Sequence, residues 1–255
     1  MVRTLTLASI VLLATVAGAA PVEPTPKEQA VRTVVRAVAE KAAAIQKLPP
    51  KERPTGDALT DTYIRSAAAA ALPLDKSVRA PGFLIGLGIA LDDSTILSGN
   101  PLTKKLCAAA ETADERKDRI KNLGSPTIHK RRDLCQHFAV SVALTEIFGP
   151  ALAELAGVAK ERADMKGTSG FSFVDLALDL AGIEFAVRIQ KTPGKLDGIA
   201  KEFAIADYAP AIDGLSEGLN EAAFQKEFGG PTDPRYTGQV EAIRKRVQAV
   251  KAYKE

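Results

Sequence analysis

The sequence has few of the residues that build stacking surfaces, disulfide scaffolds and imidazole-rich metal centres. Its 255 residues include no Trp, 9 Phe and 4 Tyr, so stacking platforms for sugars or nucleobases are scarce. Two Cys exclude a disulfide-dense scaffold and a four-cysteine zinc module. Two His exclude a metal centre built on several imidazoles. The remainder is an ordinary globular composition, with 46% hydrophobic residues, 25% charged residues and a net charge of +3.

The first 20 residues have the pattern of a secretory signal peptide. Arg3 precedes an uncharged, mostly apolar run, and small residues follow that run. Ala17 and Ala19 fit the A-x-A cleavage rule, which predicts cleavage after about Ala19 and a periplasmic or secreted protein. An uncleaved N-terminal anchor is the alternative, although the run is shorter than the ~20 residues that cross a bilayer. We expect no transmembrane segment in the mature chain.

Export makes the two cysteines candidates for a disulfide, because the destination is usually oxidising. Cys107 and Cys135 either form this bridge or are buried free thiols on separate helices. The sequence leaves both possibilities open, because it does not supply the distance between them.

Helix signals recur along the chain with short connections between them. Residues 25–28 (TPKE) combine a Thr N-cap with Pro at the first position and Glu at the third. Asn100-Pro101 predicts one helix to about residue 123, and Ser172 predicts the cap of a helix to about residue 190. No alternation of period two stands out, so the sequence predicts an all-α, multi-helix bundle with short connections. Further helices are expected at 57–71, 81–92, 132–148, 151–165, 196–206, 217–228 and 236–252.

A Pro-, Lys- and Arg-rich stretch at residues 48–56 suggests a boundary within this helical chain. We therefore expect residues 1–19 to be the signal peptide, residues 20–56 a spacer with an N-terminal helix, and residues 57–255 the helical domain.

Two short motifs invite functional interpretations that the context does not favour. Gly86-Leu87-Gly88 lies in an apolar helical run without a preceding strand, which favours close helix packing over a nucleotide loop. The basic residues 129–132 are too few to make a nucleic-acid-binding stripe, so we expect no nucleic acid partner. A solvated surface is the simpler interpretation, with contact to an anionic envelope component as the alternative. No motif indicates a cofactor.

The candidate site begins with the single histidine outside that basic cluster. Asp133, His137 and Ser141 are spaced by four, and so they lie on one face of a predicted helix. Short turns at residues 149–150 and 167–170 make the next two helices antiparallel neighbours of this one.

Carboxylates mark the other two helices. Glu161 and Asp164 are three residues apart on the second helix, where Lys160 precedes Asp164 by four. Asp175 and Asp179 are four residues apart on the third. We expect the three polar stripes to meet.

One histidine facing several carboxylates is consistent with three roles. It is a general acid–base arrangement, for which the candidate catalytic residues are His137, Glu161, Asp164, Asp175 and Asp179. It is also a possible hard-metal site through oxygen ligands, although we assign no metal from the sequence. The third role is a structural network that fixes one packing of the helices, and this is the leading hypothesis.

The same residues carry a resemblance. The runs DLCQHFAVSVAL at 133–144 and GVAKERADMKGTSGFSFVDLALDLAG at 157–182 resemble an uncharacterised group of secreted bacterial helical proteins. Their shared pattern is DLxQHF, KExxD and SGFSFxDL, and the likeness extends from about Pro81 to the C-terminus. More loosely, about 50 residues resemble the YfiM-like periplasmic lipoproteins and the VanZ-like proteins, through a D-x-x-x-H-F helix, an acidic helix and a D-x-x-x-[DN] helix.

The resemblance implies export and a helical fold, and it implies no established activity. The VanZ-like proteins are linked to envelope physiology, but they are membrane-embedded, whereas this chain has no matching spans. The leading hypothesis is thus an exported, soluble helical protein, envelope-associated or secreted, with a structural polar centre. The alternative is a hydrolase of an envelope component that uses His137 as general base. A third hypothesis places a partner-binding surface in the turn-rich residues 210–219 and 229–236.

Overall fold

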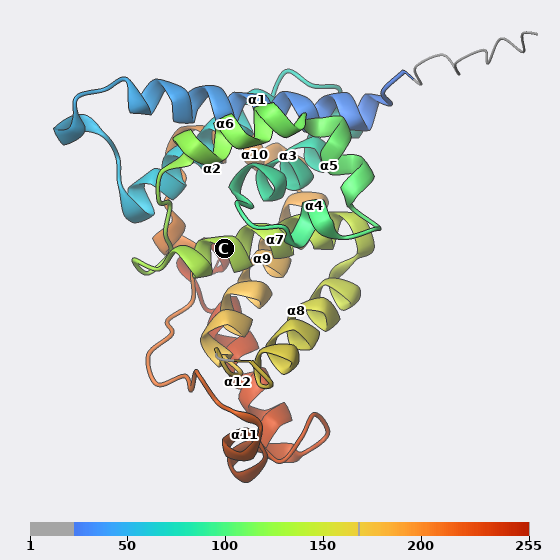
Figure 1. The fold of residues 1–255 in the computed structure, drawn as a ribbon, viewed down its shortest axis with the longest axis vertical. Helices are drawn as coiled ribbons and strands as arrows, with labels where there is room; N and C mark the ends of the chain where they lie inside the picture. Colours follow the sequence, from blue (N-terminus) through green and yellow to red (C-terminus); the bar gives the residue numbers. More distant parts are fainter. Residues whose placement is uncertain (1–22, 168, 255) are drawn as a thin grey trace, which may run out of the picture.

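The computed structural model describes residues 23–167 and 169–254, which form twelve α-helices and no β-strand (Figure 1). The predicted all-α, multi-helix bundle with short connections is confirmed. The predicted signal peptide and its cleavage position lie outside the described residues. The helices are α1 Pro26–Gln46, α2 Gly56–Ala71, α3 Lys76–Leu91, α4 Ile96–Gly99, α5 Lys104–Ala110, α6 Ala113–Leu123, α7 Arg132–Phe148, α8 Pro150–Asp164, α9 Phe173–Lys191, α10 Leu196–Glu202, α11 Glu221–Phe228 and α12 Pro234–Gln248.

Helix α1 runs along one end of the molecule, and α11 lies at the other (Figure 1). The capping box that the sequence predicts for α1 is present, since Thr25 and Glu28 each accept from the other's backbone N–H. The apolar face of α1 packs along α3, and it belongs to the same hydrophobic core as the later helices.

Helices α3, α7 and α9 form the centre of this core, where small residues let backbones approach closely. A Cβ on Gly86 would lie 2.6 Å from the Cβ of Val34 on α1, and one on Gly88 would overlap Ala143 of α7. Gly182 of α9 meets the carbonyl of Phe138 on α7 in the same way. The Gly-Leu-Gly motif therefore serves helix packing.

The single helix predicted from residue 100 to about residue 123 is wrong. The chain forms two helices there instead, α5 and α6. The break falls at Glu111 and Thr112, because Thr112 and Glu115 make a second capping box that starts α6. Glu111 leaves the helical path, and its carboxylate binds the buried Arg119.

Both cysteines are free and buried, Cys107 on α5 and Cys135 on α7. Burial raises the pKa of Cys107 to about 11 and that of Cys135 to about 12. Of the two possibilities left open by the sequence, the structure has two buried thiols on separate helices.

The turn-rich C-terminal segment is partly built into the fold. Phe171 and Leu219 exchange two backbone hydrogen bonds of 2.8 and 3.0 Å, which attach residues 216–219 to the chain just before α9. Tyr236 is buried in an aromatic cluster with Phe171 and Phe173. Within the described part of the chain, none of the helices has the length and apolarity needed to cross a membrane.

Candidate functional site

Three consecutive helices bring four of the five predicted site residues together. His137 lies on α7, Glu161 on α8, and Asp175 and Asp179 lie one turn apart on α9. Gly149 makes the tight connection between α7 and α8 with φ of 85°, a left-handed conformation that suits glycine. We call these four residues the His137 centre.

Asp179 holds the imidazole from one side. The ring Nδ1 of His137 lies 3.0 Å from Asp179 Oδ1, and the same oxygen accepts a hydrogen bond of 2.8 Å from Ser141 Oγ. Because Ser141 is one turn after His137 on α7, two residues of one helix face bind one carboxylate of α9.

Two further carboxylates face the other side of the ring. His137 Nε2 lies 3.4 Å from Asp175 Oδ2 and 4.0 Å from Glu161 Oε1. These three side-chain atoms lie within 4.8 Å of one another, so they are the residues that could hold a metal ion. Each ring nitrogen thus faces carboxylate oxygen.

The charges in the His137 centre shift each other's ionisation. Burial alone would lower the pKa of His137, but Asp179 and Asp175 outweigh it and raise the pKa to about 10. Burial would raise the pKa of Asp175, and the facing imidazole instead lowers it. Burial raises the pKa of Glu161 despite the neighbouring Lys160. The two aspartates thus favour the protonated imidazole, and burial disfavours the charge of Glu161.

Asp164, the fifth predicted residue, joins the site through a lysine and not through a hydrogen bond or ion pair with His137. Lys160 Nζ donates to Asp164 Oδ2 at 2.9 Å and to Glu161 Oε1 at 3.0 Å. The backbone N–H of Ser172 binds the second oxygen of Glu161 at 2.9 Å. Glu161 is thereby fixed at both oxygens although its side chain is fully buried.

Asp133 shares the helix face of His137 but lies at the surface. Its exposed carboxylate pairs with Arg131, which also reaches Asp175 Oδ1 at 3.3 Å and Glu217 Oε2 at 2.6 Å. Sequence reasoning placed Arg131 in a solvated basic cluster, and the connection to Asp175 across 44 residues could not be read from spacing.

Gly157 is a part of the site that the sequence analysis missed. A Cβ at this position of α8 would lie 2.6 Å from Asp179 Oδ2. That oxygen is buried and has no hydrogen-bond partner among the described residues. The absence of a side chain at residue 157 therefore makes room for the Asp179 carboxylate.

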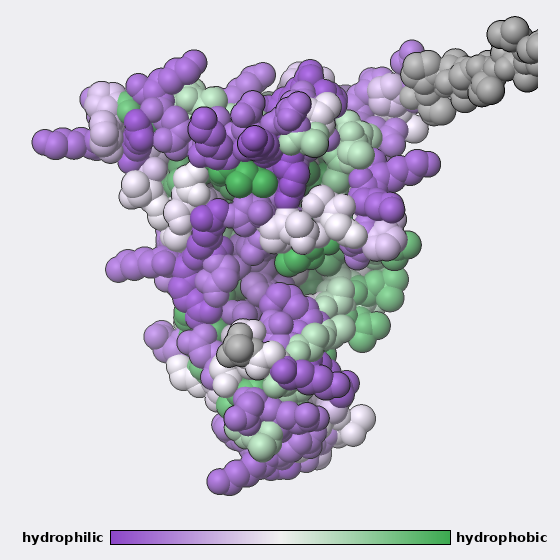
Figure 2. All heavy atoms as spheres, in the orientation of Figure 1, coloured by the Kyte–Doolittle hydropathy of each residue, from purple (hydrophilic) through white to green (hydrophobic). Residues whose placement is uncertain are grey.

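A cavity of about 400 Å³ opens beside the His137 centre, between α7, α8 and the segment around α4. Its walls are apolar, and its polar lining includes His137, Ser141 and Asp179. At its edge, Leu102 and Leu152 are 75% and 56% exposed. Figure 2 shows hydrophobic surface over the α8 side of the molecule.

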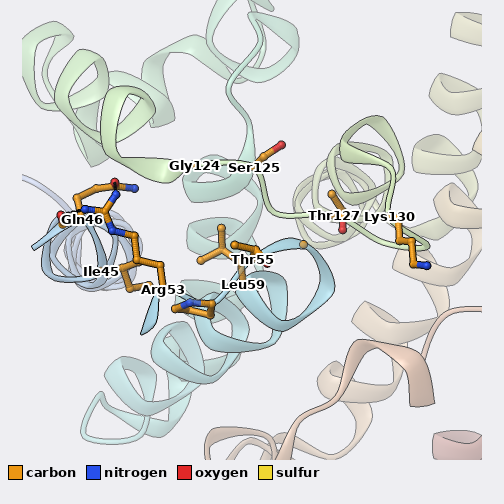
Figure 3. A pocket seen from close by; sticks show the side chains of 11 residues that line it. Ile45, Gln46, Arg53, Thr55, Leu59, Gly124, Ser125, Thr127 and Lys130 are labelled. Carbon is orange, nitrogen blue, oxygen red and sulfur yellow. Dashed lines mark hydrogen bonds between the residues drawn. The ribbon is translucent and has the colours of Figure 1, made fainter. Parts of the chain in front are cut away.

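A second cavity, of about 380 Å³, lies at the other end of α7 and offers no comparable chemistry. Gln46 and Arg53 stand on one side of it, with Thr127 and Lys130 on the other (Figure 3). Arg53 is bound to Gln46 and to the carbonyl of Leu48, so its donors are used within the fold.

Comparison with known proteins adds no relative: no family model, no curated protein and no solved structure matches the chain. The geometry of the site therefore carries the functional argument.

Proposed function

We propose that the protein is an exported, non-catalytic helical protein, envelope-associated or secreted, whose His137 centre fixes the packing of α7, α8 and α9. The observation that carries the proposal is that His137 presents both ring nitrogens to carboxylates of α9, with Asp179 at 3.0 Å and Asp175 at 3.4 Å. Export rests on the signal-peptide pattern of residues 1–19.

The protonation of His137 supports a structural role. A doubly protonated imidazole donates from both nitrogens, so it can bridge Asp175 and Asp179 across one turn of α9. A general base needs a free nitrogen lone pair directed at its substrate, whereas Nε2 here faces Asp175 and Glu161. The His137 centre is thus better suited to holding the helices together than to accepting a proton from a substrate.

Thermal unfolding of His137→Ala tests the proposal. Removing the imidazole takes the cation from the buried Asp179, which keeps only the Ser141 hydroxyl as a donor among the described residues. Breaking a buried pair in this way costs about 3–5 kcal/mol. For a chain of this size each kcal/mol lowers the melting temperature by about 2–4 °C. His129→Asn is the matched control, because the ring of His129 contacts a single backbone carbonyl, that of Pro210, and Asn tolerates the left-handed backbone there.

A His137→Ala protein that melts with the wild type would contradict the structural role. An equally large fall in the melting temperature of His129→Asn would show that the loss is not specific to the His137 centre. Circular dichroism before heating establishes that both variants fold.

The alternative function is hydrolysis of an envelope component, and the cavity is the observation that favours it. It brings solvent-accessible space to His137 next to Ser141 and Lys160. In this alternative His137 is the general base, Glu161 or Asp164 orients it, and Asp175 or Asp179 contacts substrate. Nitrophenyl esters of short and medium acyl chains provide the test: turnover by the wild type that a folded His137→Gln variant lacks would favour the hydrolase, and equal rates would exclude His137 as its base.

A further inference from the structure

We propose that His137 Nε2, Glu161 Oε1 and Asp175 Oδ2 form a binding site for one divalent transition metal ion of the Zn²⁺ or Mn²⁺ type. Zn–N and Zn–O bonds are about 2.0–2.2 Å long, so two ligands of one ion lie about 3–4 Å apart. The distances from His137 Nε2 to Asp175 and Glu161 are 3.4 and 4.0 Å. Small side-chain rotations would bring all three atoms onto one ion. The ion would take the place of the proton on Nε2, which is released to solvent, while Nδ1–H stays on Asp179.

The opposite end of each prospective ligand is held by another group. His137 Nδ1 is bound to Asp179, an arrangement that orients a metal-binding imidazole and directs Nε2 at the ion. Asp175 Oδ1 is bound by Arg131, and Glu161 Oε2 by the backbone N–H of Ser172. The atoms left facing one another are the three that would bind the metal.

One buried carboxylate oxygen that lacks a donor gives a second reason for a cation in the centre. Asp179 Oδ2 has no hydrogen-bond partner among the described residues although Asp179 is 3% exposed. Three buried or half-buried carboxylates, Glu161, Asp175 and Asp179, surround one imidazole. Burying a carboxylate without full compensation is costly, and a divalent cation supplies the missing charge.

Metal binding requires Lys160 to give up its hydrogen bond to Glu161. Its amine binds Glu161 Oε1, the oxygen assigned to the metal, but it also binds Asp164 at 2.9 Å. With a 38% exposed side chain, Lys160 can keep Asp164 and release Glu161. Lys160 also lines the 400 Å³ cavity with His137, so the cavity is the route by which an ion reaches the centre.

The ligand set indicates the class of ion. One imidazole and two carboxylates suit Zn²⁺, Mn²⁺ and Fe²⁺, whereas Mg²⁺ and Ca²⁺ favour oxygen ligands alone. The inference shares the His137 centre with the proposed structural role but does not depend on it. The structural role concerns the stability of the metal-free protein, and the metal site concerns binding.

The experiment is calorimetric titration of the exported protein with ZnCl₂ after chelator treatment, with Mn²⁺ followed in parallel by electron paramagnetic resonance. We expect one ion per chain. Glu161→Gln and Asp175→Asn should abolish binding, and Asp179→Asn should weaken it about 10- to 100-fold, as loss of an outer partner does. Asp197→Asn is the matched control, because it removes an exposed carboxylate on α10 that pairs with Lys201 and lies outside the centre, and it should bind like the wild type.

Absence of Zn²⁺ and Mn²⁺ binding by the wild type at millimolar ion would overturn the proposal. Binding that survives in Glu161→Gln and Asp175→Asn would overturn it too, because the ion would then be elsewhere. His129→Asn should retain binding, which separates the site from the other histidine. If Glu161→Gln fails to fold, Glu161→Asp keeps the charge and withdraws the oxygen by one methylene, and it should still weaken binding. The melting of metal-free His137→Ala is a separate measurement, so either hypothesis can fail alone.

Discussion

Arg119 and His137 are both buried cations with carboxylate partners from neighbouring elements, but their surroundings differ. The Arg119 guanidinium on α6 makes five hydrogen bonds, two to Glu111 at 2.7 Å and three to the carbonyls of Ala90 and Asp92. These bonds use all five of its N–H groups. Around His137 three carboxylates share one imidazole, and within the described part of the chain Asp179 Oδ2 has no hydrogen-bond partner.

The two sites differ in whether all of their hydrogen-bonding groups are used. Those of Arg119 are, whereas the His137 centre keeps one carboxylate oxygen that can accept a further bond. A buried network whose members are all satisfied rigidifies the fold and leaves no room for a ligand. Arg119 also binds the carbonyls at the end of α3, so it ties α6 to the core. The His137 centre adjoins a cavity and has acceptor capacity to spare, which is why we place the metal there.

The largest expected effect is that of Arg119→Ala. The substitution leaves the buried Glu111 with only its 3.2 Å ion pair to Arg116 and frees the carbonyls of Ala90 and Asp92, so we expect a loss of about 3–5 kcal/mol. Urea unfolding followed by circular dichroism measures it. Lys201→Ala is the control, because its i,i+4 pair with Asp197 is exposed to solvent, so the urea midpoint should stay close to that of the wild type. Equal urea midpoints for Arg119→Ala and Lys201→Ala would contradict the expectation that the buried Arg119 pair stabilises the fold more than an exposed pair does.

A smaller effect is expected from Gly157→Ala. The new methyl group would displace the Asp179 carboxylate, and overpacking of this kind costs about 1–3 kcal/mol. Gly198→Ala is matched to it, since Gly198 is also helical, on α10, but nothing lies within 4 Å of its Cβ position. It should stabilise the protein by about 0.4–1 kcal/mol. If both substitutions shift the melting temperature in the same direction, the Asp179 carboxylate can move away from a Cβ at residue 157 at little cost.

The sequence predicted those parts of the fold that depend on local signals. Thr25 and Ser172 cap α1 and α9 as expected, because N-cap hydrogen bonds join residues three apart. The break between α5 and α6 was missed, although Thr112 and Glu115 have the same capping spacing as residues 25–28. The residues around Glu111 have the pattern of a continuous helix. The ion pair between Glu111 and Arg119, which forms where the chain leaves that helix, cannot be seen in the sequence.

The candidate site was predictable as far as helix periodicity extends. The spacing of Asp175 and Asp179, and the short turn at Gly149, were enough to bring them to His137. Periodicity could not show that Asp133 points to solvent, nor that Gly157 makes room for Asp179. Those facts depend on which side of each helix meets its neighbour, and only packing in three dimensions decides it.

The smallest effect, and the most direct test of the comparison, is that of Glu161→Gln in metal-free protein. Because burial raises the pKa of Glu161, the fold disfavours its charge, and a neutral amide of the same shape should change stability by about 1 kcal/mol or less. Glu111→Gln makes the same chemical change beside Arg119 and should cost about 3 kcal/mol, since the guanidinium then loses its counter-charge. Urea midpoints in the presence of chelator measure both. Equal losses would mean that the charge of Glu161 stabilises the His137 centre as much as the charge of Glu111 stabilises the Arg119 pair, which would contradict the difference between the two sites.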